Sequence, residues 1–141
     1  MEELQANHFS TLQDKEKWIV RSKGKNIKYA IDNDLKTFFT TKRDCRKEDF
    51  FEIDFKETKQ IAGLSLDVFE IVNAMPAEVT IAISSDGKNW VDIKKTATAG
   101  KKLIDIMFDK SIAARFLKIT PSKVSPAHSP WNINNIEVYG K

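Results

Sequence analysis

Residues 79–90 read VTIAISSDGKNW, and this stretch decides the fold class. Its first half alternates apolar residues with small or polar ones, which is the period of a strand with one face toward a core. The Asp86-Gly87 pair tolerates the positive φ of a tight hairpin turn. Trp90 follows the turn and is expected to pack in the core at the start of the return strand. The stretch therefore predicts an antiparallel β-hairpin.

The same alternation recurs on both sides of this hairpin. Period-two runs occupy residues 51–55, 64–68, 104–108, 117–119 and 136–138, with turn residues between them. Residues 18–20 are expected to form another strand, and a helical turn is expected only within residues 28–36. Many short strands of this kind are typical of a β-sandwich or jelly roll. The residues expected in the core are Phe51, Ile53, Val79, Ile81, Ile83, Leu117, Ile119 and Ile136.

Length and composition predict one globular domain spanning residues 1–141. The net charge of +3 comes from scattered basic and acidic residues, so we expect a solvated surface and no nucleic-acid partner. Cys45 is the only cysteine, which excludes a disulfide within the chain and a zinc site built on thiolates. We find neither a signal peptide nor an apolar span, and a membrane is not an expected partner.

Five segments, in order, resemble the coagulation factor 5/8 type C (discoidin-like) family and the related family 32 carbohydrate-binding modules. They are residues 30–39 (AIDNDLKTFF), 50–55 (FFEIDF), 84–90 (SSDGKNW), 114–119 (ARFLKI) and 133–140 (INNIEVYG). The resemblance implies an all-β fold: an antiparallel eight-stranded jelly-roll β-sandwich, galactose-binding-domain-like, with ligand loops at one end. It also implies a non-catalytic binding role.

The sequence departs from the family pattern at several positions. Asn33 replaces a glycine, and asparagine also tolerates a left-handed turn. Phe39 stands where the family has Trp, and Thr40 where a galactose-binding His often follows. Asn135 replaces an acidic residue, and residues 69–76 lack an Arg often found in that loop. These changes leave the fold expected but do not imply galactose specificity.

The loop at residues 30–37 is rich in oxygen atoms, and together with the resemblance this predicts a structural calcium ion that pins the loop to the last strand. The spacing of its acidic residues excludes an EF-hand. The neutral amide of Asn135 should weaken binding, and the alternative is an Asx-turn loop without metal. The ligands that the resemblance implies are Ala30, Asp32, Asp34, Thr37, Asn134 and Asn135.

Residues 40–49, 69–76 and 125–131 break the strand pattern, and we expect them to form a weak glycan site at one end. Their side chains can donate to and accept from sugar hydroxyls. Trp131 is either an aromatic platform for a sugar or a plug at the end of the barrel. Trp18 is expected in the core. The candidate ligand-binding residues are Arg43, Asp44, Arg46, Glu70, Asn73, His128 and Trp131.

These observations predict a monomeric, non-catalytic carbohydrate-binding module for a terminal hexose or N-acetylhexosamine. We expect it to belong to a larger secreted, periplasmic or cell-surface protein, appended to the catalytic domain of a glycoside hydrolase such as a hexosaminidase. Enzymatic activity is not expected, because the sequence pairs neither a nucleophile with a base nor two carboxylates in distinct contexts.

Two alternatives remain open at this point. One is a phospholipid- or protein-interaction domain, in which Phe69, Ile71, Val72 and Met75 form an apolar spike at a loop tip. The other is a structural domain that packs against its own catalytic partner.

Overall fold

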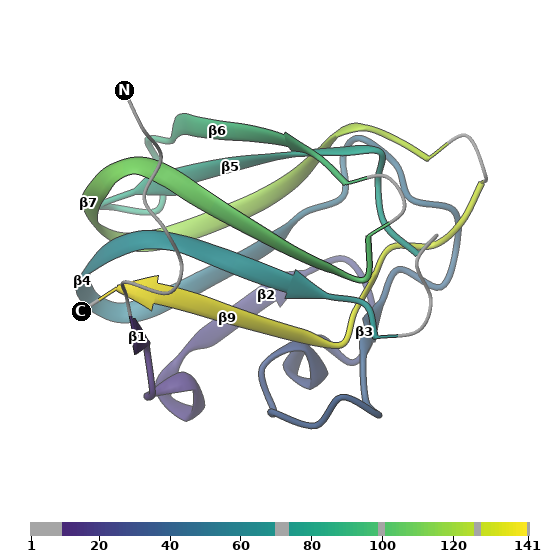
Figure 1. Ribbon diagram of the computed structural model, residues 1–141, viewed down its shortest axis with the longest axis horizontal. Coiled ribbons are helices and arrows are strands. Elements are labelled where there is room, and N and C mark those ends of the chain that lie inside the picture. Colours follow the sequence, from purple (N-terminus) through teal and green to yellow (C-terminus); the bar gives the residue numbers. More distant parts are fainter. Residues whose placement is uncertain (1–9, 70–73, 99–100, 126–127, 141) are drawn as a thin grey trace.

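Two long strands, β4 (Phe51–Asp67) and β7 (Leu103–Lys123), organise the fold (Figure 1). The computed structural model describes residues 10–69, 74–98, 101–125 and 128–140. The two strands pair antiparallel, and the register shifts between Asp54 and Lys59 and again between Ile61 and Gly63. Figure 1 shows both strands turning back on themselves, so that each contributes its two halves to two facing layers.

The first layer joins the beginning of β4 and the end of β7 to β2 (Ile19–Ser22), β5 (Glu78–Ser84) and β6 (Val91–Ala97). The second layer joins the other halves to β9 (Asn135–Gly140), with β1 (Ser10–Thr11) at its edge. Taken as separate segments, the halves of β4 and β7 together with β2, β5, β6 and β9 make the expected eight-stranded antiparallel jelly roll. The predicted fold class is confirmed.

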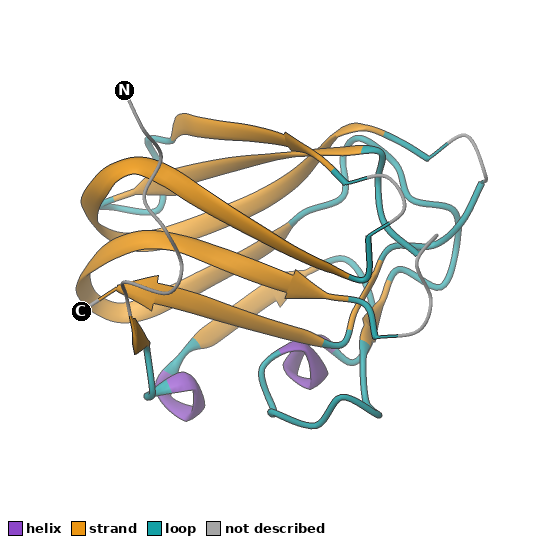
Figure 2. Cartoon of the chain, viewed as in Figure 1, coloured by secondary structure: helices purple, strands orange, loops and turns teal. Residues whose placement is uncertain are grey.

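Short elements connect the layers, and Figure 2 shows how little helix they contain. β3 (Phe39–Thr40) and β8 (Asn132–Ile133) form a separate two-stranded pair. The helical turns of the described residues are the 3-10 helices η2 (Lys15–Lys17) and η3 (Ile27–Ala30). η3 overlaps the first residues of the predicted helical region, residues 28–36, whereas η2 lies outside it. Within the described ranges, neither is long and apolar enough to cross a membrane.

The apolar faces of the two layers meet in one core. All eight residues expected there are buried, and Trp18 joins them with its ring edge-on to Phe55. The expectation for Trp90 is wrong, because its side chain is only half-buried. Strand β6 begins one residue later, and the Trp90 ring lies at the turn, with Phe116 beside it and the Lys118 ammonium 4.1 Å from its centre.

The hairpin turn at residues 84–90 forms as predicted. Gly87 has a φ of 77°, which an L-residue rarely adopts. The Asp86 carboxylate accepts hydrogen bonds from the backbone N–H groups of Lys88 and Asn89 at 2.8 and 2.9 Å, and these bonds lower the pKa of Asp86. Asn33 also takes the left-handed conformation expected of it, with a φ of 61°.

Candidate functional site

Three loops from distant parts of the sequence meet at one end of the sandwich, on the right of Figure 1. They are residues 41–50 and the described parts of 68–77 and 124–131, which we call the loop end. The backbone N–H of Cys45 donates to the Ser129 carbonyl at 3.0 Å, and that of Asn132 donates to the Ala74 carbonyl at 2.8 Å. These bonds tie each loop to another part of the same end, as expected from the breaks in the strand pattern.

Trp131 lies beneath this end rather than on it. Its side chain is fully buried, and its backbone N–H donates to the Thr41 hydroxyl at 3.0 Å. A sugar can stack only on an exposed ring face. The stacking role is therefore wrong for Trp131, and the alternative role of a plug is confirmed.

Arg43 stabilises the first loop of the loop end through an ion pair with Asp49. Its guanidinium donates through Nη2 to Asp49 Oδ1 at 2.6 Å and through Nη1 to Asp49 Oδ2 at 2.9 Å. Burial pushes the pKa of Asp49 upward, but the hydrogen bonds from Arg43 and from the Arg46 backbone outweigh it and leave the pKa lowered. Arg43 is thus committed to an ion pair, and we regard it as a positioning residue rather than a ligand contact.

The remaining described candidates are accessible. Asp44, Arg46 and His128 are exposed, and His128 Nδ1 lies 3.8 Å from Asp44 Oδ2. This pair links the first and third loops at the surface. Glu70 and Asn73 lie outside the described residues.

Phe69 is a feature of the loop end that sequence reasoning assigned only to the phospholipid alternative. Its side chain is 39% exposed, and its φ of 58° is unusual for a bulky residue. The Asp67 carboxylate holds this conformation by accepting from the Phe69 N–H at 2.7 Å. Such local strain occurs most often at functional sites.

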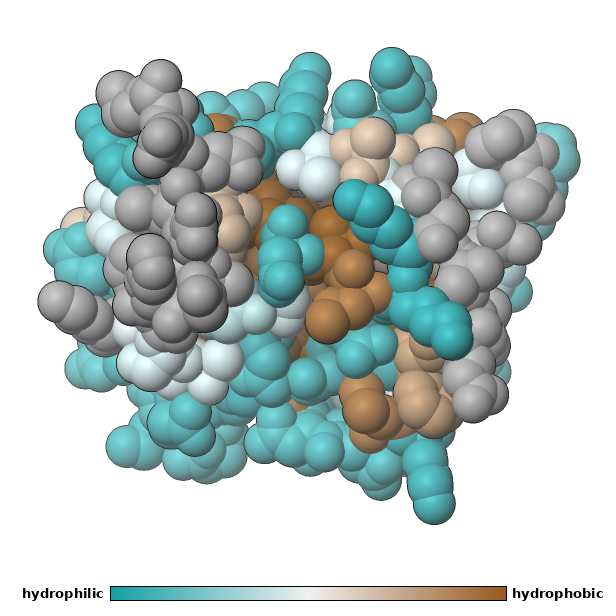
Figure 3. All heavy atoms as spheres, in the orientation of Figure 1, coloured by the Kyte–Doolittle hydropathy of each residue, from teal (hydrophilic) through white to brown (hydrophobic). Residues whose placement is uncertain are grey.

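The structure describes two of the four residues assigned to the apolar spike of that alternative, Phe69 and Met75. Met75 is 4% exposed and belongs to the core, whereas Ile71 and Val72 lie outside the described residues. In Figure 3 the coloured part of the visible face is mostly hydrophilic around a group of hydrophobic atoms at its centre. Large exposed apolar side chains sit on separate elements, as Ile19 on β2 and Val91 on β6 illustrate.

The predicted calcium loop gathers oxygen atoms only in part. The Thr37 hydroxyl lies 3.0 Å from the Asp34 carbonyl and donates to Asp32 Oδ2. The carboxylates of Asp32 and Asp34 also accept backbone N–H groups two residues ahead, which is an Asx-turn pattern. Ala30 is buried in η3, and the side-chain amide of Asn134 donates to the Leu35 carbonyl at 2.6 Å. Asp32, Asp34 and Thr37 are therefore brought together.

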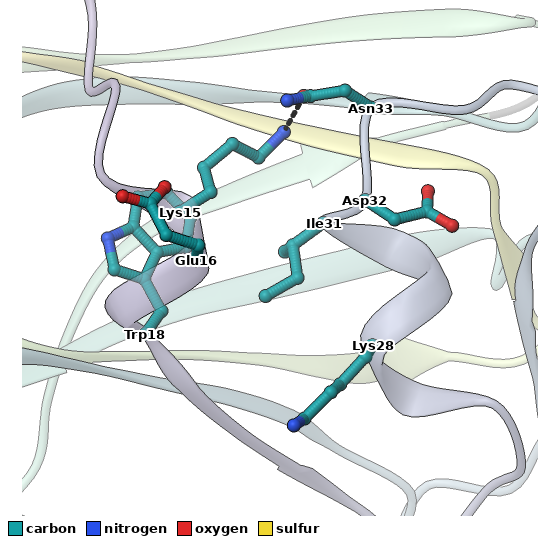
Figure 4. A pocket seen from close by; sticks show the side chains of 7 residues that line it. All are labelled: Lys15, Glu16, Trp18, Lys28, Ile31, Asp32 and Asn33. Carbon is teal, nitrogen blue, oxygen red and sulfur yellow. Dashed lines mark hydrogen bonds between the residues drawn. The ribbon is translucent and has the colours of Figure 1, made fainter.

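Asn135, the sixth predicted ligand, contacts the ammonium group of Lys15 instead of a metal ion. Lys15 Nζ lies 3.0 Å from Asn135 Oδ1 and 3.1 Å from Glu137 Oε2. It also lies 2.9 Å from Asn33 Oδ1, the contact that Figure 4 marks. Lys15 is only 4% exposed and borders a hollow of about 360 Å³. Burial lowers the pKa of Lys15, whereas Glu137 and Asp32 raise it.

These residues do not fit a calcium ion that bridges the loop and β9. An ion bound to Asn135 Oδ1 at about 2.5 Å would lie within about 5.5 Å of the ammonium. At an effective dielectric of about 20, the repulsion is of the order of 6 kcal/mol. The prediction of calcium in this loop is untested, and the bridging position that it assigns to the ion is the one that the Lys15 ammonium occupies.

Cys45 has no nucleophilic character in this setting. Its thiol is buried, and burial, with Asp49 beside it, raises its pKa to about 12. The thiol is therefore protonated at neutral pH, and His128 lies at the surface beside Asp44.

Comparison with known proteins agrees with this fold. Residues 8–138 match the family model of the F5/8 type C domain. Among curated proteins, none matches the chain.

Solved structures with the same fold include carbohydrate-binding modules of Clostridium perfringens. CBM32-3 from a family 31 glycoside hydrolase has a TM-score of 0.76 at 19% identity, covering 96% of this chain and 97% of that one. The family 32 module of NanJ, in complex with galactose, has a TM-score of 0.77 at 15% identity, covering 89% and 95%. CpGH89CBM32-5, in complex with GalNAc-β-1,3-galactose, has a TM-score of 0.78 at 16% identity, covering 93% and 100%.

Proposed function

The chain belongs to the F5/8 type C domain family, and on that premise we propose that it is a carbohydrate-binding module that binds glycans at the loop end. The observation that carries the proposal is the meeting of three loops that expose Asp44, Arg46, His128 and Phe69 on a backbone held by interloop hydrogen bonds. The fold shared with modules whose structures contain galactose or GalNAc-β-1,3-galactose supports it.

The proposed contacts to the glycan are made by polar side chains and by one aromatic ring. Arg46 and His128 can donate to sugar hydroxyls, and the Asp44 carboxylate can accept. Phe69 takes the stacking role first assigned to Trp131, because its ring is 39% exposed whereas that of Trp131 is buried. Arg43 and Asp49 hold the first loop in place.

A terminal hexose or N-acetylhexosamine is the proposed ligand. Thr40 is 7% exposed, and its hydroxyl accepts the Lys42 N–H at 3.0 Å. This side chain therefore serves the turn and does not supply the donor that a histidine would offer a galactose. We expect the sugar preference to be set by the exposed residues of the loop end instead.

We further propose that the module is appended to a secreted glycoside hydrolase and holds its catalytic domain near glycans. A shallow site that exchanges water hydrogen bonds for sugar hydrogen bonds gains only about 0.5–1.5 kcal/mol per bond. Weak binding of this kind becomes effective through tethering, which raises the local concentration of the catalytic domain.

Binding to a glycan array, followed by titration of the best glycan, tests the proposal. Phe69→Ala and Arg46→Ala should each weaken binding at least several-fold. The matched controls are Val91→Ala, an exposed apolar residue on β6, and Lys88→Ala, an exposed cation of the hairpin turn, which should bind like the parent. Equal binding by all four variants would contradict this site, and binding to anionic vesicles without any glycan would favour the phospholipid alternative.

A further inference from the structure

The Lys15 ammonium occupies a position between two parts of the fold that are far apart in sequence. Lys15 belongs to η2, and its partners are Asn33 in the loop after η3 and Asn135 and Glu137 in β9. Lysine is rarely buried unless it is paired. At 4% exposure, Lys15 is held by these contacts rather than by water.

The three contacts use the full bonding capacity of the group. An ammonium has three N–H donors and no acceptor. Three oxygens receive them at 2.9, 3.0 and 3.1 Å, one from the loop and two from the strand. The Asn135 amide also donates to Glu137 Oε2 at 2.9 Å, and this bond holds the two β9 side chains that contact Lys15 in position.

The charges of this cluster suit a single positive charge rather than a double one. Asn33 and Asn135 are neutral, and among the described residues Glu137 is the carboxylate hydrogen-bonded to Lys15, with Asp32 acting on it through charge alone. Calcium prefers sites with more carboxylate oxygens. One ammonium and one carboxylate balance each other without any further ion.

From this geometry we infer that the Lys15 ammonium takes the place of a bridging metal ion, and that the chain holds the loop after η3 against β9 without calcium. The inference concerns the architecture beside η2 and does not depend on which glycan the loop end binds.

Thermal melting of the unmodified protein in excess chelator and in millimolar calcium is the first test. The inference predicts the same melting temperature in both, since no ion adds to the tie between loop and strand. A ligand that binds only the folded chain raises the melting temperature by mass action. A rise of several degrees in calcium would overturn the inference.

Variants test the role of the lysine. Lys15→Met should lower the melting temperature more than Lys17→Met, an exposed lysine in the same 3-10 helix. Lys15→Gln combined with Asn135→Glu removes the ammonium and adds a carboxylate, so this double variant should gain a calcium-dependent rise in melting temperature. Equal effects of the two methionine variants, or a double variant that ignores calcium, would show that Lys15 does not stand in for an ion.

Discussion

Trp131 stands edge-on to Phe39, with ring centroids 5.8 Å apart and ring planes at 89°. Phe39 makes a similar contact with Phe51 of β4 at 5.1 Å. The three aromatic rings pack against one another beneath the loop end. The residue first considered for sugar stacking is therefore part of the support for the site.

Replacement of Trp131 should lower the stability of the fold rather than remove a contact with the glycan. Trp131→Ala removes a fully buried ring and should lower the free energy of unfolding by about 3–5 kcal/mol. Trp131→Phe should be milder, because an aromatic ring remains and the indole N–H has no hydrogen-bond partner within the described residues. Urea denaturation measures both. A stable Trp131→Ala variant that loses glycan binding would contradict this account and show that Trp131 contacts the glycan.

Removal of Arg43 should leave Asp49 as a buried charge without its main partner. Asp49 is 1% exposed, whereas the Arg43 side chain is 36% exposed, so solvent screening reduces the effect. We expect Arg43→Ala to lower the free energy of unfolding by about 2–3 kcal/mol. The control is Arg115→Ala, whose partner Asp54 is more accessible; it should lower the free energy of unfolding less than Arg43→Ala does. Similar losses in the two variants would contradict the supporting role of Arg43.

Asp49 also predicts how stability depends on pH. Its pKa is lowered in the folded chain, so the unfolded chain takes up the proton first as the pH falls. The stabilisation is therefore present above the ordinary aspartate pKa of about 3.9 and is lost as the pH falls through the folded value. The stability difference between the parent and Asp49→Asn should stay constant from about pH 7 to about pH 5 and shrink as the pH falls below about 4. A difference that also stays constant below about pH 4, in urea melts at each pH, would argue against the ion pair.

Gly140 allows β9 to approach β4 closely. A Cβ atom added there would lie 1.9 Å from the Gln60 carbonyl oxygen, a contact that only backbone movement can relieve. Gly140→Ala should therefore lower the free energy of unfolding by about 1–3 kcal/mol or more. Ala62→Gly, in the adjoining stretch of β4, serves as a control for changes in side-chain size without a clash. A Gly140→Ala variant as stable as the parent would show that the strand ends can separate freely.

The sequence predicted the layers of the fold better than the continuity of its strands. Residues 51–55 and 64–68 were expected as separate strands, because Lys56, Glu57 and Thr58 read as a turn. The structure instead carries β4 through this point: Lys56 takes a φ of 71°, and Asp54 Oδ1 accepts its N–H at 2.8 Å. Local residue types indicate a bend, but the pairing of β4 with β7 on both sides decides that the strand continues.

The candidate site was predictable to the extent that it depends on breaks in alternation. The segments at residues 40–49, 69–76 and 125–131 were expected together for that reason, and the structure joins the first and the third through Cys45 and Ser129. The choice between the two roles considered for Trp131, and the engagement of Lys15, could not be decided from the sequence, because each depends on partners far along the chain. The separation between Lys15 and Glu137, for example, is 122 residues.

Backbone amide shifts during titration with galactose, N-acetylgalactosamine, N-acetylglucosamine and fucose test the central claim most directly. The account predicts that at least one sugar shifts amides in the loop end, with a dissociation constant in the millimolar to high-micromolar range, roughly −4 to −6 kcal/mol. Residues 84–90, which lie at the other end of β5, should not move. The absence of shifts with every sugar, or shifts centred on residues 84–90, would contradict glycan binding at the loop end.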